Sequence, residues 1–437
     1  MISVTSHIRS LEDTPEAVHC EGLGGRGGVL GYVAGAVANL NMSANTVVDE
    51  RRSRPDSSVD PSGGLFLVLA VANAIGYVPS TCMPVWVGQI AAAVGWPAWS
   101  GGTLATLQLG MLTIGNISAA QFIGRFAART LASCVALGAA LGFLIMGTLT
   151  PVALVAGSII SGLCCGCLLA IANSMAAGFP RAQHAFAMLQ LVLVLLGVIL
   201  FFTLPRLLQA HGVAAVFIVL GGCALLSSPL LTKLPGQRSP QMAAQPYLQL
   251  ELNWRPAAAL LALALALASQ TAIMACVFEA GVRVGLNLAT VGTYMSGAAL
   301  LCLLYPFAAR LLGERVGLVF PLAASTLLLG LAAAFIMHAF SRTLFFVLLT
   351  ALLGLPLFIL PYVLALLARF DRSGRWAAIG PGFLMTGVAI GPSIAAFVRS
   401  RASLEQLGPL MAIMIVIASA IFFIAGRSPL VPARVSH

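Results

Sequence analysis

From residue 64 to residue 426 the chain is a succession of apolar runs, separated by short stretches that contain Pro, Gly and Arg. A helix of about 20 apolar residues is what a hydrocarbon core about 30 Å thick requires. Only 8% of the 437 residues are charged and 59% are hydrophobic, whereas a soluble domain carries about 25% charged residues. So few charges cannot cover a water-soluble fold of this size. The chain is therefore predicted to be an all-α polytopic membrane protein.

The hydropathy pattern predicts twelve transmembrane helices, bounded by Pro, Gly and Arg clusters. The predicted spans are 64–93, 101–122, 131–149, 151–177, 184–204, 212–232, 256–280, 287–309, 316–338, 343–368, 376–398 and 407–426. The longest hydrophilic interruption inside the bundle follows the sixth span and divides the helices into six plus six. The predicted domains are an N-terminal tail 1–62, an N-terminal half 63–232, a central loop 233–255, a C-terminal half 256–428 and a C-terminal tail 429–437.

The N-terminal segment 1–62 differs in composition from the rest of the chain. It holds eight of the thirteen acidic residues, and its apolar stretch 28–40 is short and rich in Gly. We expect a disordered cytoplasmic tail without a signal peptide. Met42 is an alternative start.

The placement of Lys and Arg predicts the orientation of the bundle. The loops after odd-numbered spans hold five such residues, Arg206, Arg283, Arg342, Arg399 and Arg401. The loops after even-numbered spans hold eleven: Arg125, Arg129, Arg181, Lys233, Arg238, Arg255, Arg310, Arg315, Arg369, Arg372 and Arg375. Both termini are therefore expected in the cytoplasm, and the chain in the cell inner membrane.

Three tryptophans, Trp86, Trp96 and Trp99, are expected at the outer interface, where amphipathic rings are favoured. The basic residues that give the net charge of +10 are scattered singly or in pairs. They are typical of topology signals and not of a nucleic-acid surface.

Cys164, Cys165 and Cys167 have the spacing of a small metal cluster. Neither His nor a carboxylate lies near them, and Gly162 and Gly166 flank them. Small residues of this kind allow helices to approach closely. We expect packing here, with no metal and no cofactor.

A four-residue repeat supports the six-plus-six division. Phe126-Ala127-Ala128-Arg129, after the second span, recurs as Phe307-Ala308-Ala309-Arg310 after the eighth. Because the two copies occupy equivalent places in the two halves, an internal duplication is the better interpretation. Parallel repeats related by an axis along the membrane normal are a known transporter plan.

With these loops the chain resembles the major facilitator superfamily over roughly residues 64–428. That family carries a Gly-x-Leu-Ala-Asp-Arg-x-Gly-Arg loop between helices 2 and 3 and again between helices 8 and 9. The resemblance implies a cytoplasmic gate at Arg129 and Arg310, flanked here by Arg125 and Arg315. Both copies have Ala in place of the family's Asp, which argues against a charge-relay form of the gate.

The resemblance is weaker to the proton-coupled drug antiporters of the family. Those proteins carry an Arg in helix 4 and a Gly-Pro pair in helix 5. Here Ser158 stands near the position of that Arg, and the fifth span has no Gly-Pro, although Gly391-Pro392 occurs in the eleventh. These departures favour uptake over drug export, with efflux kept as the alternative.

Glu279 is the only acidic residue predicted within a span. An ionisable group in a membrane is costly and therefore a functional candidate. It has two interpretations. Burial could raise its pKa and make it a proton-coupling site. Alternatively it pairs with Arg283, four residues later on the same helical face, and this second interpretation is favoured.

Uncharged polar residues near the middle of spans are the candidates for binding a solute at the midplane. Hydrogen bonding between helices is the competing role for each of them. No Lys or Arg lies in mid-span to neutralise an anion, so the lining favours a neutral or amphipathic organic solute. The candidates are Asn73, Tyr77, Asn173, Gln190, Gln270, Tyr294 and Tyr362.

The sequence thus predicts a secondary transporter that works by alternating access, functions as a monomer in the lipid bilayer and is not an enzyme. Proton-coupled uptake is one option and uniport another. A membrane enzyme would need a His, Asp or Glu constellation at the interface, and the loops offer mostly Arg. No Gly-x-x-x-x-Gly-Lys-Ser/Thr motif is present for ATP binding. A solute sensor without transport remains a further alternative.

Overall fold

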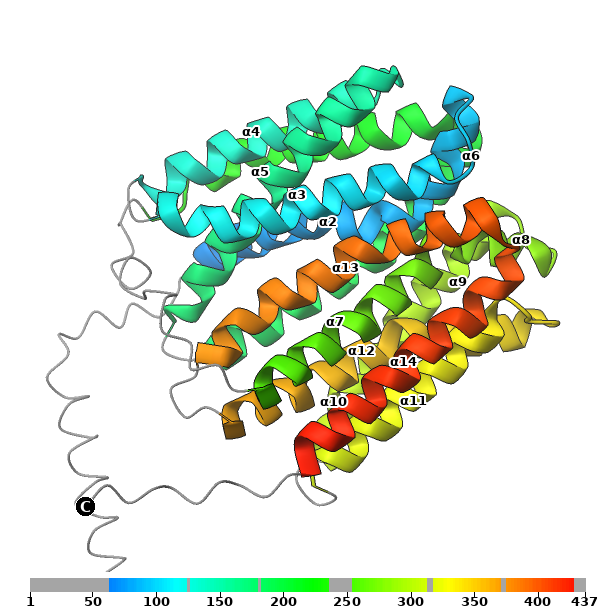
Figure 1. The fold of residues 1–437 in the computed structure, drawn as a ribbon. Helices are drawn as coiled ribbons and strands as arrows, with labels where there is room; N and C mark the ends of the chain where they lie inside the picture. Colours follow the sequence, from blue (N-terminus) through cyan, green and yellow to red (C-terminus); the bar gives the residue numbers. More distant parts are fainter. Residues whose placement is uncertain are drawn as a thin grey trace, which may run out of the picture. The chain divides into compact units, whose positions relative to one another are not determined.

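The structure is a computed structural model that describes residues 63–123, 126–179, 182–235, 254–312, 317–370 and 375–427. Within these ranges every long element is an α-helix (Figure 1). The predicted tails 1–62 and 429–437 and most of the predicted central loop lie outside the described residues.

The helices follow one another through short connections. They are α2 (Gly63–Val94), α3 (Ser100–Ile123), α4 (Ala128–Met146), α5 (Pro151–Ala177), α6 (Ala182–Leu231), α7 (Trp254–Ala275), α8 (Val277–Arg283), α9 (Leu288–Leu301), α10 (Leu304–Leu312), α11 (Val319–Ile336), α12 (Arg342–Phe370), α13 (Arg375–Arg401) and α14 (Leu404–Arg427). Ten of them are long and apolar enough to cross a membrane. The chain is therefore a multi-pass membrane protein.

The predicted break at 205–211 between the fifth and sixth spans is wrong. α6 continues through Pro205 and changes direction only at Gly212, where φ is 78° and two helices meet. Glycine adopts this left-handed backbone without a steric penalty because it has no Cβ. The boundary between the two helices therefore depends on one residue and not on a polar loop.

Two other predicted spans are interrupted near one end. The span 256–280 breaks at Cys276, so α7 is followed by the short helix α8. The span 287–309 breaks after Leu301, and α10 continues from Leu304. Hydropathy stays high through both breaks, which is why the apolar pattern did not reveal them.

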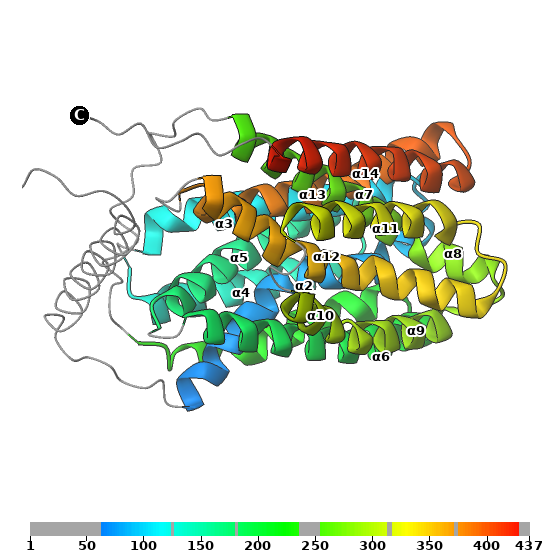
Figure 2. The same cartoon turned by 90° about the horizontal axis from the view of Figure 1, so that it is seen from below.

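The described residues all belong to one compact unit. Within it we distinguish a first set of helices, α2–α6, and a second set, α7–α14. In the first set α5 packs against α2, α3 and α4; in the second, α7 packs against α13 and α14, and α11 against α14 and α12. The sets meet mainly where α3 lies along α13 and where α6 lies along α9, with α2 contacting α7 and α8. Figure 1 shows α13 between α3 and α7, and Figure 2 shows α6 beside α9.

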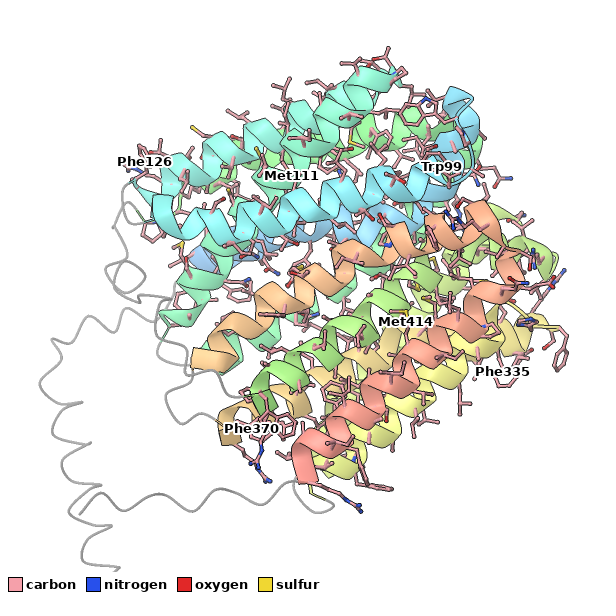
Figure 3. All side chains as sticks on the ribbon, viewed as in Figure 1. Trp99, Met111, Phe126, Phe335, Phe370 and Met414 are labelled. Atoms are coloured by element: carbon pink, nitrogen blue, oxygen red, sulfur yellow. The ribbon has the colours of Figure 1, made fainter. Side chains whose placement is uncertain are left out.

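The bundle has two ends, which Figure 3 marks by labelled side chains. Trp99 and Phe335 lie at one end, which is also that of α8, and Phe126 and Phe370 lie at the other. We call these the α8 end and the Phe126 end. Trp99 is 43% exposed, as expected of an interfacial ring. Trp86 is only 1% exposed and packs on Phe217, so its predicted interfacial position is wrong.

Glycines allow several of these helices to touch through their backbones. Gly391 of α13 faces α7, where a Cβ would collide with the Thr271 hydroxyl and lie 2.5 Å from the Ala268 carbonyl oxygen. Neither neighbour moves easily, because the Thr271 hydroxyl is bonded to its own helix through the Leu267 carbonyl. The spacing between α7 and α13 therefore depends on the missing side chain.

Gly391→Ala is expected to destabilise the folded protein by about 3 kcal/mol, the upper range for overpacking. Thermal unfolding of the purified protein measures this effect. Gly110→Ala is the matched control, because no atom lies within 4 Å of a Cβ at Gly110. The control should unfold at or slightly above the wild-type temperature. Equal unfolding temperatures for both variants would show that the α7–α13 contact tolerates a side chain.

Candidate functional site

The contact between α2 and α5 brings two predicted binding residues onto facing surfaces. The helices run in opposite directions, and a Cβ at Gly76 would lie 2.9 Å from the Leu169 Cβ. One turn nearer to the Phe126 end, the same two faces carry Asn73 on α2 and Asn173 on α5. Tyr77 lies on the same face of α2, one turn from Asn73 toward the α8 end.

Asn73 is the most deeply buried of these polar side chains. It is 4% exposed, and its amide makes no hydrogen bond with another described residue. Its amide atoms are not among the fully enclosed side-chain atoms without a partner, which in the described residues are Thr106 Oγ1 and Gln108 Oε1. The amide of Asn73 is therefore accessible for a hydrogen bond to water or to a ligand, which makes Asn73 a candidate for solute contact.

Gln270 lies at a similar depth on the second set. A Cβ at Gly88 of α2 would lie 3.3 Å from Glu279 Oε1, which aligns α2 with α8. Gln270 lies nine residues before Glu279 in the chain. On α2, the position nine residues before Gly88 is 79, which is close to Tyr77. Both positions are thus about 14 Å below the Gly88–Glu279 contact at 1.5 Å per residue. Gln270 Nε2 donates to the Leu352 carbonyl at 3.3 Å.

Four of the predicted binding residues therefore lie within about two helical turns of one another along the bundle. We call this group the central layer. It consists of Asn73, Tyr77, Asn173 and Gln270. Its side chains are uncharged hydrogen-bonding groups with one aromatic ring.

Of the other three predicted binding residues, Tyr294 and Tyr362 lie away from the central layer. Tyr294 packs edge-on against Phe346, with ring centroids 5.5 Å apart, and lies nearer the α8 end. Gln190 of α6 lies at about the level of Asn73, because a Cβ at Gly197 would lie 3.9 Å from Thr81 of α2 and Gln190 precedes Gly197 by seven residues. Tyr362 is 4% exposed and donates its hydroxyl to the Ala309 carbonyl at 3.2 Å, which ties α12 to α10.

Two glycine–proline contacts close the bundle at the α8 end. Near the start of α3, a Cβ at Gly102 would lie 2.5 Å from the Pro392 carbonyl oxygen of α13. Near the start of α9, a Cβ at Gly292 would collide with the Phe201 carbonyl and the Pro205 ring of α6. We call this pair of contacts the α8-end seam. Each contact joins the first set to the second.

A hydrogen bond reinforces the second half of the seam. The Ser296 hydroxyl of α9 donates to the Val198 carbonyl of α6 at 2.7 Å. Sequence reasoning missed the seam, because a close backbone approach is visible only when both helices are in place. The Gly391-Pro392 pair was the one signal that pointed toward it.

Glu279 does not pair with the expected residue. Its Oε1 lies 2.8 Å from Arg399 Nη1 of α13, while Arg283 pairs with Glu405 of α14 at 3.1 Å. The predicted Glu279–Arg283 pair is therefore wrong. The Glu279–Arg399 pair is the more enclosed, with side chains 28% and 21% exposed against 59% for Glu405 and 43% for Arg283.

Glu279 lies on α8, beyond the α7 span. Burial raises the pKa of its carboxyl above the ordinary value, although the charges of Arg399 and Arg283 oppose the shift. The carboxyl therefore binds a proton at a higher pH than a free glutamate does. Protonation would remove the negative charge from the Arg399 contact, so this pair can respond to the proton concentration.

The predicted arginine gate at the Phe126 end is only partly described. Arg125, Arg315 and the side chain of Arg310 lie outside the described residues, and Arg129 is exposed in the first turn of α4. The two copies of the repeat also differ in structure. The first begins in the turn before α4, whereas the second lies within α10.

The cysteines of α5 lie against different helices. Cys164 Sγ would contact a Cβ at Gly138 of α4, and Cys167 Sγ lies 3.4 Å from the Gly115 carbonyl of α3. Among the described residues no three His, Cys, Asp or Glu side chains are grouped to hold a metal ion. The geometry of these thiols is that of helix packing.

Neither a protein-family model nor a curated protein matches this sequence. Solved structures do match. A bacterial homolog of the human lysosomal transporter Spinster, in an inward-facing and unoccupied conformation, aligns with a TM-score of 0.68 at 14% identity, covering 85% of this chain and 98% of its own. The chain has a major facilitator fold.

Two further transporters share this major facilitator fold. The nucleoside transporter NupG aligns with a TM-score of 0.66 at 13% identity, over 83% of this chain and 99% of its own. The POT family transporter PepTSo aligns with a TM-score of 0.64 at 12% identity, over 83% and 97%. The structural neighbours are thus transporters, and at these identities the likeness is one of fold.

Proposed function

We propose that this chain is a secondary transporter that moves a small neutral or amphipathic organic solute across the inner membrane by alternating access. The observation that carries the proposal is the uncharged central layer, which lies about 14 Å from the Gly88–Glu279 contact at the α8 end, in helices of both sets. Solute sites of such transporters lie at the midplane, between two repeats that rock about them. The amide of Asn73, which makes no hydrogen bond to another described residue, supplies a group to which a solute would bind.

The twelve predicted spans fit the described helices when α3 and the two parts of α6 are each counted as a span. α3 has 24 residues, which is long enough to cross. The first set then forms one half and the second set the other. Two equivalent contacts, α3 on α13 and α9 on α6, support parallel halves related by an axis along the membrane normal.

In this proposal the α8 end faces outward, and the Phe126 end and both termini face the cytoplasm. The basic loops after even-numbered spans support this orientation. The α8-end seam is then a closed outer gate, and the solute enters or leaves the central layer from the cytoplasm. Arg125, Arg129, Arg310 and Arg315 would act at the cytoplasmic gate when that side closes.

Glu279 is proposed as the coupling residue of proton-driven uptake. Its ion pair with Arg399 lies at the outer gate, and its raised pKa favours proton binding from the outside. Loss of the carboxylate charge would free Arg399 and weaken the contact of α8 with α13. Efflux of an organic compound remains the alternative direction.

Spent medium from cells that express the chain, compared by mass spectrometry with an empty-vector control, tests the proposal. Depletion of a compound from the medium and its enrichment in cells would establish uptake and name the solute. Accumulation outside the cells would establish efflux and contradict the proposed direction. No change in any compound across several growth media would contradict transport itself and favour a sensor.

Asn73→Ala is expected to raise the KM for the transported solute about tenfold, because one hydrogen bond in a water-poor site contributes about 1.4 kcal/mol. The initial uptake rate as a function of solute concentration measures this change. Tyr362→Phe is the matched control, because its hydroxyl is equally buried but bonded to Ala309. An unchanged KM in Asn73→Ala, or a larger change in Tyr362→Phe, would remove the central layer as the binding site.

A further inference from the structure

Arg206 lies on an exposed face of α6 and is bonded to both sets of helices. Its Nη2 donates to the Thr293 hydroxyl of α9 at 2.9 Å, and its Nη1 donates to the Phe202 carbonyl. The guanidinium carbon lies 3.6 Å from the centroid of the Phe202 ring, which is itself 46% exposed. The side chain is therefore held in one position while its outer edge remains accessible.

This guanidinium lacks a protein counter-charge within the described helices. The ion pairs found there are Arg283–Glu405 and Arg399–Glu279, and neither includes Arg206. α6 and α9 contain no acidic residue. Arg206 lies six residues before Gly212, where the first of the two helices in α6 ends, so it is outside the last turn, in which a helix C-terminus stabilises a positive charge. A charged side chain in a membrane span is costly unless it finds a partner.

The depth of Arg206 indicates what that partner is. Six residues correspond to about 9 Å along the helix, so Arg206 lies about 9 Å from the kink at Gly212, where the two helices of α6 meet. Arginines at this level extend toward the lipid headgroups. Two of the five N–H donors of a guanidinium are used by Thr293 and Phe202, and those that remain suit the oxygens of a phosphate.

We infer that Arg206 is a binding site for the phosphate of an anionic phospholipid, and that the bound headgroup stabilises the closed α8-end seam. Thr293 acts as a positioning residue, since its hydroxyl accepts from Arg206 and donates to the Ala289 carbonyl. Gly292 and Pro205, which form half of the seam, immediately precede Thr293 and Arg206. The site is therefore complete only while α6 and α9 are in contact, and a lipid that binds only this arrangement shifts the equilibrium toward it.

The test uses the full-length protein in nanodiscs of phosphatidylcholine, with and without phosphatidylglycerol. The midpoint of thermal unfolding and native mass spectrometry of retained lipid are the two readouts. Phosphatidylglycerol should raise the midpoint and remain bound, and Arg206→Gln should weaken its binding about tenfold, as expected for the loss of a charge-assisted contact.

Arg401→Gln is the matched control, because Arg401 is also exposed and stacks on a phenylalanine, Phe397, at 4.7 Å. It should bind phosphatidylglycerol like the wild type.

Equal losses in Arg206→Gln and Arg401→Gln would reduce the effect to bulk surface charge and overturn the inference. The same stabilisation by inorganic phosphate in pure phosphatidylcholine would assign the site to a free anion and overturn the lipid assignment. If Arg206→Gln does not fold, Thr293→Val decides the matter, since it keeps the charge and removes the positioning bond. Unchanged phosphatidylglycerol binding in that variant would also contradict the inference. Because these readouts need no solute, they do not depend on the proposed transport.

Discussion

Glu279→Gln is expected to abolish accumulation of the solute against its gradient and to leave exchange of labelled for unlabelled solute intact. The amide cannot take up or release a proton, but its shape still fills the space between Gly88 and Arg399. Exchange needs only the movement of the loaded transporter, whereas accumulation needs the proton to travel with it. Uptake into proteoliposomes with an imposed pH gradient, compared with counterflow in the same vesicles, separates the two.

The pH dependence should follow the raised pKa of Glu279. Since the folded protein binds this proton more tightly than a free glutamate does, the protonated form dominates up to a higher pH than the ordinary value of 4.5. Gradient-driven uptake in the wild type should therefore decline as the external pH rises above the folded pKa, and the Gln variant should show no such decline in exchange.

Glu405→Gln is the matched control for this experiment. Glu405 is also a carboxylate in an ion pair at the α8 end, but its side chain is 59% exposed and its partner is Arg283. Accumulation should persist in this control. Normal accumulation in Glu279→Gln would remove the residue from coupling and favour uniport or another proton carrier.

Gly292→Ala is expected to open the α8-end seam and to lower the transport rate about tenfold. The added methyl group has no room, since it would meet the Phe201 carbonyl and the Pro205 ring. α9 must then move away from α6, which disfavours the closed arrangement by about 1–3 kcal/mol. A shift of this size changes a two-state population by about tenfold or more.

Cys276 provides the readout for this opening. The thiol is 2% exposed and lies beside the Glu279–Arg399 pair. In a variant that retains Cys276 as its sole cysteine, Gly292→Ala should accelerate labelling by a membrane-impermeant maleimide added from outside. Gly297→Ala, on the same helix, is the control, since a Cβ there would make only ordinary contact at 3.4 Å with Phe346. Equal labelling rates in the two variants would show that the seam does not control access.

The positions of the helices could be predicted from the sequence because lipid requires long apolar segments, and these are visible in hydropathy. The helix breaks could not, because each depends on one or two residues. Pro205 was expected to end a helix, yet α6 continues through it and packs its ring against Gly292. The turn occurs instead at Gly212, seven residues further along and directly after Gln209, Ala210 and His211.

The candidate site was predictable to the extent that polar residues are rare in the spans. Four of the candidates lie within about two turns of one another, namely Asn73, Tyr77, Asn173 and Gln270, whereas the hydroxyl of Tyr362 bonds to the backbone of a neighbouring helix. A single sequence cannot distinguish these roles, because both place a polar group in an apolar helix. The partner of Glu279 was missed for a related reason, since pairing within a helix is visible in sequence and pairing with α13 is not.

The uncharged central layer has a consequence for bioenergetics. The four side chains of the central layer carry no charge across the membrane. The electric current per transport cycle is therefore set by the charge of the solute and by any proton on Glu279. A neutral solute moved with one proton would carry one elementary charge, worth about 2.3 kcal/mol per 100 mV. That energy corresponds to a concentration ratio of about fifty at this potential. The ratio of solute concentrations across the membrane, measured in vesicles in which only the membrane potential is varied, should therefore give the number of protons moved with each solute.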